Sequence, residues 1–221
     1  MAKVIQLRGL VVQHHMIVDG EDVHLIDGGF IGGISRIEKA LARLGKDFSN
    51  VRSIILSHGH LDHTLNVARL QKLTGAIVFA PQVDRDHLEG RHSYQGWSRI
   101  CGWFENTGRL LLSFKPPAID QWFIDGEDVM GMTVISLPGH TVGHCGFLLT
   151  NEKILLAGDL FTNHFGRPTP PPRAFNDNHE EARRSIVKAA KLDLQGVFLN
   201  HSWKTTPEEA LLALIDLAND L

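Results

Sequence analysis

The chain has 221 residues, of which 43% are hydrophobic, and this length and composition suit one globular domain with a buried core. Its 22 basic and 25 acidic residues leave a net charge of -3, which predicts no nucleic-acid partner, and no apolar run approaches the roughly 20 residues that span a membrane. Two cysteines, Cys101 and Cys145, make no disulfide framework, and the N-terminus lacks a signal-peptide pattern, so the sequence predicts a cytoplasmic protein, monomeric or homo-oligomeric.

In the first half of the chain, short apolar runs predict strands, and residues at helical spacing predict helices between them. Strands are predicted at 4–7, 11–18 and 23–27, where glycine and acidic residues separate the runs as in a β-meander. Ile34, Ile37, Leu41 and Leu44 follow helical spacing over 32–45, and Gly45 suits a C-terminal cap. A continuous apolar strand follows at 51–57, then a helix over 63–75 and a strand over 75–80.

The second half begins with a less regular segment at about 84–125, which is helical in part at most. Strands are predicted at 132–137, 146–150, 153–158 and 196–200, and helices at 178–193 and 206–220. Thr206 is the expected N-cap of the last helix, with Pro207 in its first position.

Histidine and aspartate follow the ends of four of these strands. The run SHGHLDHT begins as the 51–57 strand ends and contains His58, and the later strand ends lead to His140, Asp159 and His201. Sites in open α/β sheets form beyond the strand ends, so side chains that are far apart in the chain are expected to converge there.

These residue types point to metal chemistry. Imidazole nitrogen and carboxylate oxygen are good zinc ligands, and a catalytic zinc keeps one position for water. Seven such residues exceed the needs of one tetrahedral ion, so the sequence predicts two ions, zinc in the first place, with iron or manganese as alternatives. The predicted ligands are His58, His60, Asp62, His63, His140, Asp159 and His201.

The order of motifs resembles that of the metallo-β-lactamase-fold hydrolase superfamily. The matching stretches, from about residue 20 to residue 205, are LIDGGF at 25–30, HGHLDH at 58–63, PGHTVGH at 138–144, AGDLF at 157–161 and NHS at 200–202. The resemblance implies an α/β chain folded as a four-layer αββα sandwich that forms one domain over residues 1–221.

The same resemblance implies a division of the ligands. His58, His60 and His140 would hold one metal, Asp62, His63 and His201 the other, and Asp159 would bridge them, with Asp62 also orienting the attacking hydroxide. One departure is that Asn200 and Ser202 flank His201, where the family usually has glycines.

The implied activity is hydrolysis of an ester, thioester or lactone bond of a small acyl substrate by a metal-activated hydroxide, as in the glyoxalase II-like and lactonase-like branches. Because about twenty residues follow His201, the C-terminal helical region that glyoxalase II enzymes use for glutathione is expected to be missing or much reduced. Asp159 stands where well-known true β-lactamases of this fold place Cys or Ser, which argues against β-lactams. A mononuclear-iron persulfide dioxygenase, a true β-lactamase and a metal binder without catalysis remain alternatives.

Residues outside the ligand set receive structural or substrate roles. His144 is expected to support the site or to pack, and Asp27 to form a turn beneath the metal loops. The 84–125 segment is an insertion that forms either core or a substrate wall or lid. The candidates for this wall are Trp97, Trp103, Trp122, Phe161 and Phe165.

Overall fold

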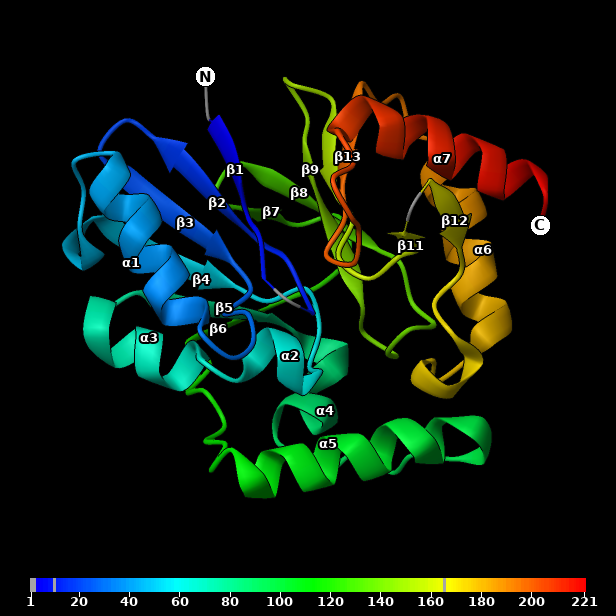
Figure 1. Cartoon of the computed structure of the whole chain (residues 1–221), viewed down its shortest axis with the longest axis horizontal. Helices are drawn as coiled ribbons and strands as arrows, with labels where there is room; N and C mark the ends of the chain where they lie inside the picture. The colour runs from blue at the N-terminus through cyan, green and yellow to red at the C-terminus, as the bar shows by residue number, and fades with distance from the viewer. Residues whose placement is uncertain (1–2, 10, 165) are drawn as a thin grey trace.

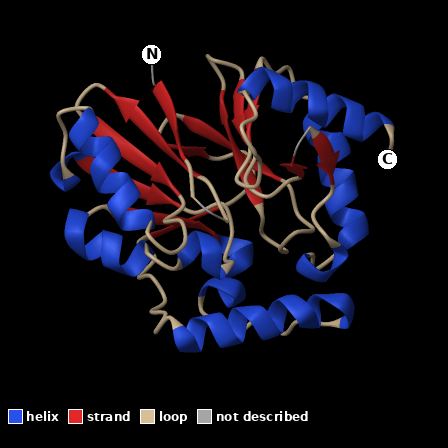
Figure 2. Ribbon diagram, in the orientation of Figure 1, coloured by secondary structure: helices blue, strands red, loops and turns tan. Residues whose placement is uncertain are grey.

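Two β-sheets pack face to face, and helices cover the outer face of each (Figures 1 and 2). The computed structural model describes residues 3–9, 11–164 and 166–221. The resulting order of layers is helix, sheet, sheet, helix, which confirms the expected αββα architecture.

The first sheet has six strands in the order β1-β2-β3-β4-β5-β6. They are β1 (Lys3–Leu7), β2 (His14–Asp19), β3 (Asp22–Ile26), β4 (Val51–Ile55), β5 (Ile77–Pro81) and β6 (Gln121–Phe123). The first three form the predicted antiparallel meander, and β3 to β6 run parallel. The carboxyl ends of the parallel strands therefore meet at one edge of the sheet.

The second sheet has five strands in the order β13-β10-β9-β8-β7. They are β7 (Asp128–Val129), β8 (Met132–Ser136), β9 (Cys145–Leu149), β10 (Ile154–Leu156) and β13 (Gly196–Phe198). Because β10 pairs in parallel with β13 and both β8 and β10 are antiparallel to β9, the strands β8, β10 and β13 share one direction. A separate hairpin joins β11 (Thr162–His164) to β12 (Arg167–Thr169).

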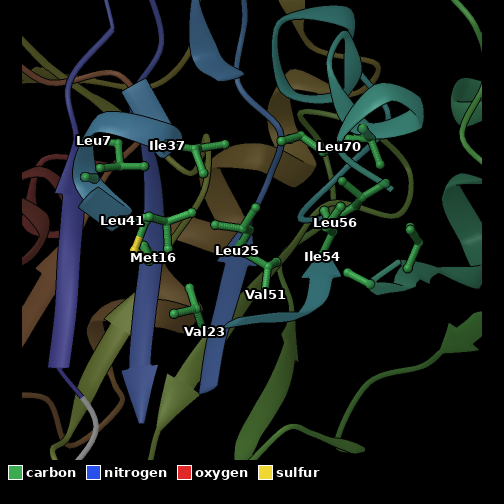
Figure 3. Close-up of a cluster of buried hydrophobic side chains, with 14 of the residues drawn as sticks. Leu7, Met16, Val23, Leu25, Ile37, Leu41, Val51, Ile54, Leu56 and Leu70 are labelled. Carbon is green, nitrogen blue, oxygen red and sulfur yellow. The ribbon is translucent and has the colours of Figure 1, made fainter. Parts of the chain in front are cut away.

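Three apolar clusters hold the layers together. The outer cluster of the first sheet packs α1 (Gly33–Arg43) and α3 (Val67–Thr74) onto the strands, and Figure 3 shows Ile37 and Leu41 of α1 reaching Leu25. The middle cluster joins the sheets, for example Ile55 with Phe147. The third packs α6 (His179–Ala190) and α7 (Pro207–Asn219) onto the second sheet.

Helix ends follow the chemistry that the sequence indicates. Gly45 adopts a positive φ of 68° just after α1, a conformation that glycine reaches without a Cβ penalty. At the start of α7 the hydroxyl of Thr206 accepts a hydrogen bond from the backbone N–H of Glu209, and the Glu209 carboxylate accepts one from the N–H of Thr206.

Two predicted elements differ from the observed ones. The strand expected at 11–18 begins only at His14, because residues 11–13 lie outside any strand. The helix expected over 63–75 is divided into α2 (Leu61–Thr64) and α3. At the break, the side-chain amide of Asn66 donates hydrogen bonds to the backbone oxygens of Gly28, Gly29 and Phe30 and so fixes the loop after β3.

The 84–125 segment is more regular than the sequence suggested. It contains α4 (Arg85–Leu88), the 13-residue helix α5 (Arg99–Leu111) and β6, and Figure 1 shows α5 lying across the lower edge of the molecule below α2 and α4. Among the described residues, no helix combines the length and the apolar character that crossing a membrane requires.

Candidate metal centre

Seven side chains from four separate segments of the chain converge between the two sheets. His58 and His60 follow β4, and Asp62 and His63 lie in the short helix α2 directly after them, whereas His140 follows β8. Asp159 follows β10 and His201 follows β13. All five imidazoles and both carboxylates of the predicted set are therefore brought to one place, which the shared direction of the strands explains.

The donor atoms form two groups that meet at Asp159. In the first group the ligand atoms of His58, His60 and His140 lie within 4.8 Å of one another, and Nδ1 of His60 is 3.0 Å from Nε2 of His140. Nε2 of His140 lies 3.3 Å from Oδ2 of Asp159. Around a tetrahedral zinc with bonds of about 2.0–2.1 Å, neighbouring ligand atoms are about 3.3 Å apart, so these spacings suit one ion.

The second group consists of Asp62, His63 and His201. Nε2 of His201 lies 3.4 Å from Oδ2 of Asp62 and 3.1 Å from Oδ2 of Asp159. Nε2 of His63 lies 3.3 Å from Oδ1 of Asp159. The Asp159 carboxylate thus lies next to histidines of both groups and could contact an ion in either one.

Unpaired buried atoms show that these residues fit a cation. Nε2 of His58, Nε2 of His63 and Oδ1 of Asp159 are buried and have no hydrogen-bond partner among the described residues. A buried polar atom without a partner is costly, and divalent ions in the two groups would satisfy all three.

Outer partners orient the ligand histidines. Nδ1–H of His58 donates to Oγ of Ser57 over 3.0 Å, and Nδ1–H of His140 donates to Oδ1 of Asn176 over 3.1 Å. These bonds leave Nε2 of both rings free to face inward. His60 is turned the other way, with Nε2 3.8 Å from Sγ of Cys101 and Nδ1 facing the centre.

Asp27 supports the centre from beneath. Its carboxylate accepts hydrogen bonds from the backbone and hydroxyl of Ser57, from Nδ1 of His63 and from the side-chain amide of Asn200, at 2.8–2.9 Å. The expected supporting role is therefore confirmed, and the Asn200 that replaces a family glycine takes part in it.

His144 supports the Asp159 segment. Its Nδ1–H donates to the backbone oxygen of Leu137 over 2.8 Å, and its Nε2 accepts the backbone N–H of Asp159 over 3.0 Å. Burial lowers the pKa of His144 to about 4, which keeps the ring neutral for both bonds. Because both nitrogens are occupied, His144 positions Asp159, as its expected supporting role implies.

The charges of the two groups differ. Burial, assisted by neighbouring imidazoles, lowers the pKa of His58 and His60, so both rings are neutral as metal ligands must be. Burial also acts to lower the pKa of His201, but Asp159 and Asp62 outweigh it and raise that pKa to about 10. The carboxylates of the second group therefore attract positive charge strongly.

Two carboxylates that the sequence did not single out, Glu105 on α5 and Asp84 just before α4, bond to the loops that carry the candidate ligands. The Glu105 carboxylate accepts the backbone N–H of Leu61 over 3.0 Å. The buried Asp84 carboxylate accepts the N–H of Gly59 over 2.7 Å, the hydroxyl of Thr141 over 2.9 Å and the N–H of Gly143 over 2.8 Å. The contacts join segments that are remote in the chain, so no local pattern marks them.

The predicted aromatic wall divides into several parts. Trp97, just before α5, is 69% exposed, and Trp103, on α5, is 63% exposed. Both remain candidates for contact with a substrate. Trp122 lies on the opposite side of β6 from Phe123, packs against the outer cluster and carries the guanidinium of Arg85 4.4 Å from its ring centre. Trp122 is therefore a packing residue in this structure.

Phe161, which closely follows Asp159, is not part of a substrate wall. Phe161 is fully buried in the cluster beneath α6 and α7, so it is a core residue that no substrate reaches. Phe165 lies outside the described residues. Another aromatic pair is partly exposed, because the rings of Phe104 on α5 and Phe175 stack with centroids 6.3 Å apart.

We predict that Asp27→Asn lowers metal affinity by about 10- to 100-fold, the range found for outer-shell partners of metal ligands. Asn tolerates the positive φ of 64° at this position but removes the charge that holds His63. Competition titration against a chelator measures the affinity, and Asp19→Ala at the exposed end of β2 is the control. Unchanged affinity in Asp27→Asn would show that Asp27 serves the fold alone.

Comparison with known proteins agrees with this geometry. The model of the metallo-beta-lactamase superfamily matches residues 9–201. The probable metallo-hydrolase YybB of Bacillus subtilis is 28% identical over 72% of this chain and 66% of its own length. Hydroxyacylglutathione hydrolase GloC of Haemophilus influenzae is 27% identical over 69% of this chain and 68% of its length.

Other relatives align over shorter stretches. N-acyl homoserine lactonase AttM of Rhizobium johnstonii is 32% identical over 52% of this chain, and the match covers 43% of its length. The chain thus spans about two thirds or less of the length of these relatives.

Solved structures share the fold. A metallo-beta-lactamase family protein of Thermus thermophilus aligns over 99% of this chain and 78% of its own with a TM-score of 0.73 at 23% identity. The subclass B3 metallo-beta-lactamase BJP-1 of Bradyrhizobium japonicum aligns over 100% of this chain and 89% of its own with a TM-score of 0.69 at 19% identity. The fold and the order of motifs agree with this family, and so does a centre rich in His and Asp, which suits the divalent metal that the fold implies. The chain belongs to the metallo-beta-lactamase superfamily.

Proposed function

We propose that the protein is a dinuclear metal hydrolase that cleaves the acyl bond of a small thioester or lactone, with zinc as the metal. The observation that carries this proposal is the pair of donor groups that share Asp159. The first group consists of three imidazoles, His58, His60 and His140, whereas the Asp62, His63 and His201 group carries a further carboxylate.

Two divalent ions in these groups would supply Lewis acidity to the acyl carbonyl and lower the pKa of a water to near neutrality. The chain itself supplies the orientation. The side chains of Asp62 and His201 are 25% and 19% exposed, whereas that of His63 is fully buried, so the centre opens to solvent on the side of Asp62. Asp62 therefore faces the space through which water and substrate enter, and its carboxylate would orient the attacking water.

The proposed substrate class has support from two sides. Relatives named for the hydrolysis of a hydroxyacylglutathione and of N-acyl homoserine lactones are among those that match. In addition, Phe104 and Phe175 are adjacent to the supports of the ligands. Phe175 precedes Asn176, which bonds to His140, and Phe104 lies one helical turn after Cys101, which faces His60.

Elemental analysis tests the proposed centre. We expect gently purified protein to bind at least two divalent ions per chain, with zinc restoring hydrolysis after chelation. The seven clustered donors exceed the needs of one ion. A single ion per chain that zinc addition does not increase would contradict the dinuclear centre, and iron with oxygen uptake would favour a dioxygenase instead. Bound metal without turnover of any acyl substrate would favour a binding protein.

A further inference from the structure

A second group of metal-type side chains lies outside the seven-residue centre. His87 belongs to α4, His92 to the loop that follows it, and Asp177 to the loop before α6. Their ligand atoms lie within 4.8 Å of one another, although the two histidines and the aspartate are 85 to 90 residues apart in the chain. The fold therefore assembles this group from distant segments.

Both imidazoles present the same nitrogen to one carboxylate. Nε2 of His87 is 2.7 Å from Oδ2 of Asp177, and Nε2 of His92 is 2.9 Å from Oδ1. The two rings stack with centroids 3.6 Å apart and planes 17° apart. Within the described part of the chain, no lysine or arginine lies within ion-pair distance of this carboxylate, so the two rings are its charged or chargeable partners there.

Outer partners surround the group as they surround metal ligands. The hydroxyl of Tyr94 lies 3.4 Å from Nδ1 of His87, so a ring bound through Nε2 would find an acceptor for its Nδ1–H. The backbone N–H of Val142 donates to Oδ2 of Asp177 over 3.2 Å and fixes that carboxylate. His87 is fully buried, whereas the side chain of His92 is 18% exposed and leaves a path from solvent.

We propose that His87, His92 and Asp177 form a separate binding site for a divalent cation of the zinc type. Two imidazoles and one carboxylate are a sufficient protein set for a zinc whose fourth position is water. Ligand atoms around such an ion are about 3.3 Å apart, which is wider than the 2.7 and 2.9 Å seen here. The partly exposed His92 is on a loop and moves outward to admit the ion.

An ion at this site would tie the α4 segment to the metal loops. The backbone N–H of Asp177 donates to the oxygen of His140, and a Cβ at Gly59 would lie 2.5 Å from Cβ of His87. The cation would thus join two segments that each touch a loop of the main centre. Since the site forms only in the folded chain, zinc bound there would raise the melting temperature.

The count of bound zinc in His92→Gln tests this site. Glutamine keeps an N–H that donates to Asp177 but removes the imidazole ligand. His87 and Asp177 are left unchanged because both contact the loops of the main centre. The control is His24→Gln, which alters a partly buried histidine that bonds to Ser53 on β4, away from both sites.

We expect wild-type protein and His24→Gln to bind one more zinc per chain than His92→Gln, with a larger zinc-induced rise in melting temperature. Equal zinc counts in all three proteins would overturn the proposal and leave a hydrogen-bonded cluster. The readout is a difference of one ion, so it is independent of the main centre. Loss of hydrolysis with this difference intact would contradict the proposed function and not the second site.

Discussion

Replacing Asp62 with alanine should lower kcat by about 10²- to 10⁴-fold, the range for a positioned group that acts on a proton in the transition state. The Asp62 carboxylate stands at the open side of the centre, with Oδ2 3.4 Å from Nε2 of His201 and 3.7 Å from Nε2 of His63. The substitution removes both a donor side chain of the second group and the carboxylate that, under the proposed function, orients the attacking water.

The fold should tolerate the same change. The side chain of Asp62 is 25% exposed in the first turn of a four-residue helix, so its removal opens no apolar cavity. We expect the free energy of unfolding to change by no more than about 1 kcal/mol, as is usual for a partly exposed side chain.

Three measurements on Asp62→Ala separate its roles, namely kcat, bound metal and thermal unfolding. The control is Asp193→Ala, which removes a surface carboxylate that pairs only with Lys153 among the described residues and should keep wild-type kcat. If Asp62→Ala retained wild-type turnover at full metal content, Asp62 would have no part in the reaction. If it unfolded, its role would be structural.

Elements with a clear period were predictable from the sequence. Helix α1 lies within the predicted 32–45 because Ile37 and Leu41 repeat at helical spacing, and α7 begins after Thr206 because the cap and Pro207 are adjacent in the chain. The ligand set was also accessible, since its members cluster just beyond strand ends and parallel strands bring their ends together.

The contacts that support these residues from remote segments were not predictable. Asn176 lies 36 residues from His140, and Cys101 lies 41 residues from His60, so neither support leaves a local pattern. Phe161 shows the opposite error, in which nearness in sequence to Asp159 suggested nearness to a substrate. Its side chain packs into the core beneath α6 and α7 instead. Whether Phe161 faces the core or the site depends on the path of the loop after Asp159, and the periodicity of the sequence does not encode that path.

The second large effect concerns substrate choice and rests on the proposed function. Hydrolysis of thioesters or lactones should exceed that of β-lactams by at least about tenfold in kcat/KM, a discrimination of about 1.4 kcal/mol. Within a series of acyl thioesters or acyl lactones, each added methylene that enters an apolar site contributes about 0.8 kcal/mol, or about fourfold. The value of kcat/KM should therefore rise with chain length until the site is full.

Phe104→Ala is the sharpest variant for this series, because Phe104 is 52% exposed and stacks on Phe175 beside the supports of His60 and His140. We expect it to flatten the dependence on chain length while the shortest substrate keeps its wild-type kcat. Leu73→Ala, which removes an exposed apolar side chain on α3, should leave the slope unchanged. A flat series in the wild-type protein, together with fast cleavage of a chromogenic cephalosporin, would overturn the substrate class, and an unchanged slope in Phe104→Ala would exclude this aromatic pair from the acyl site.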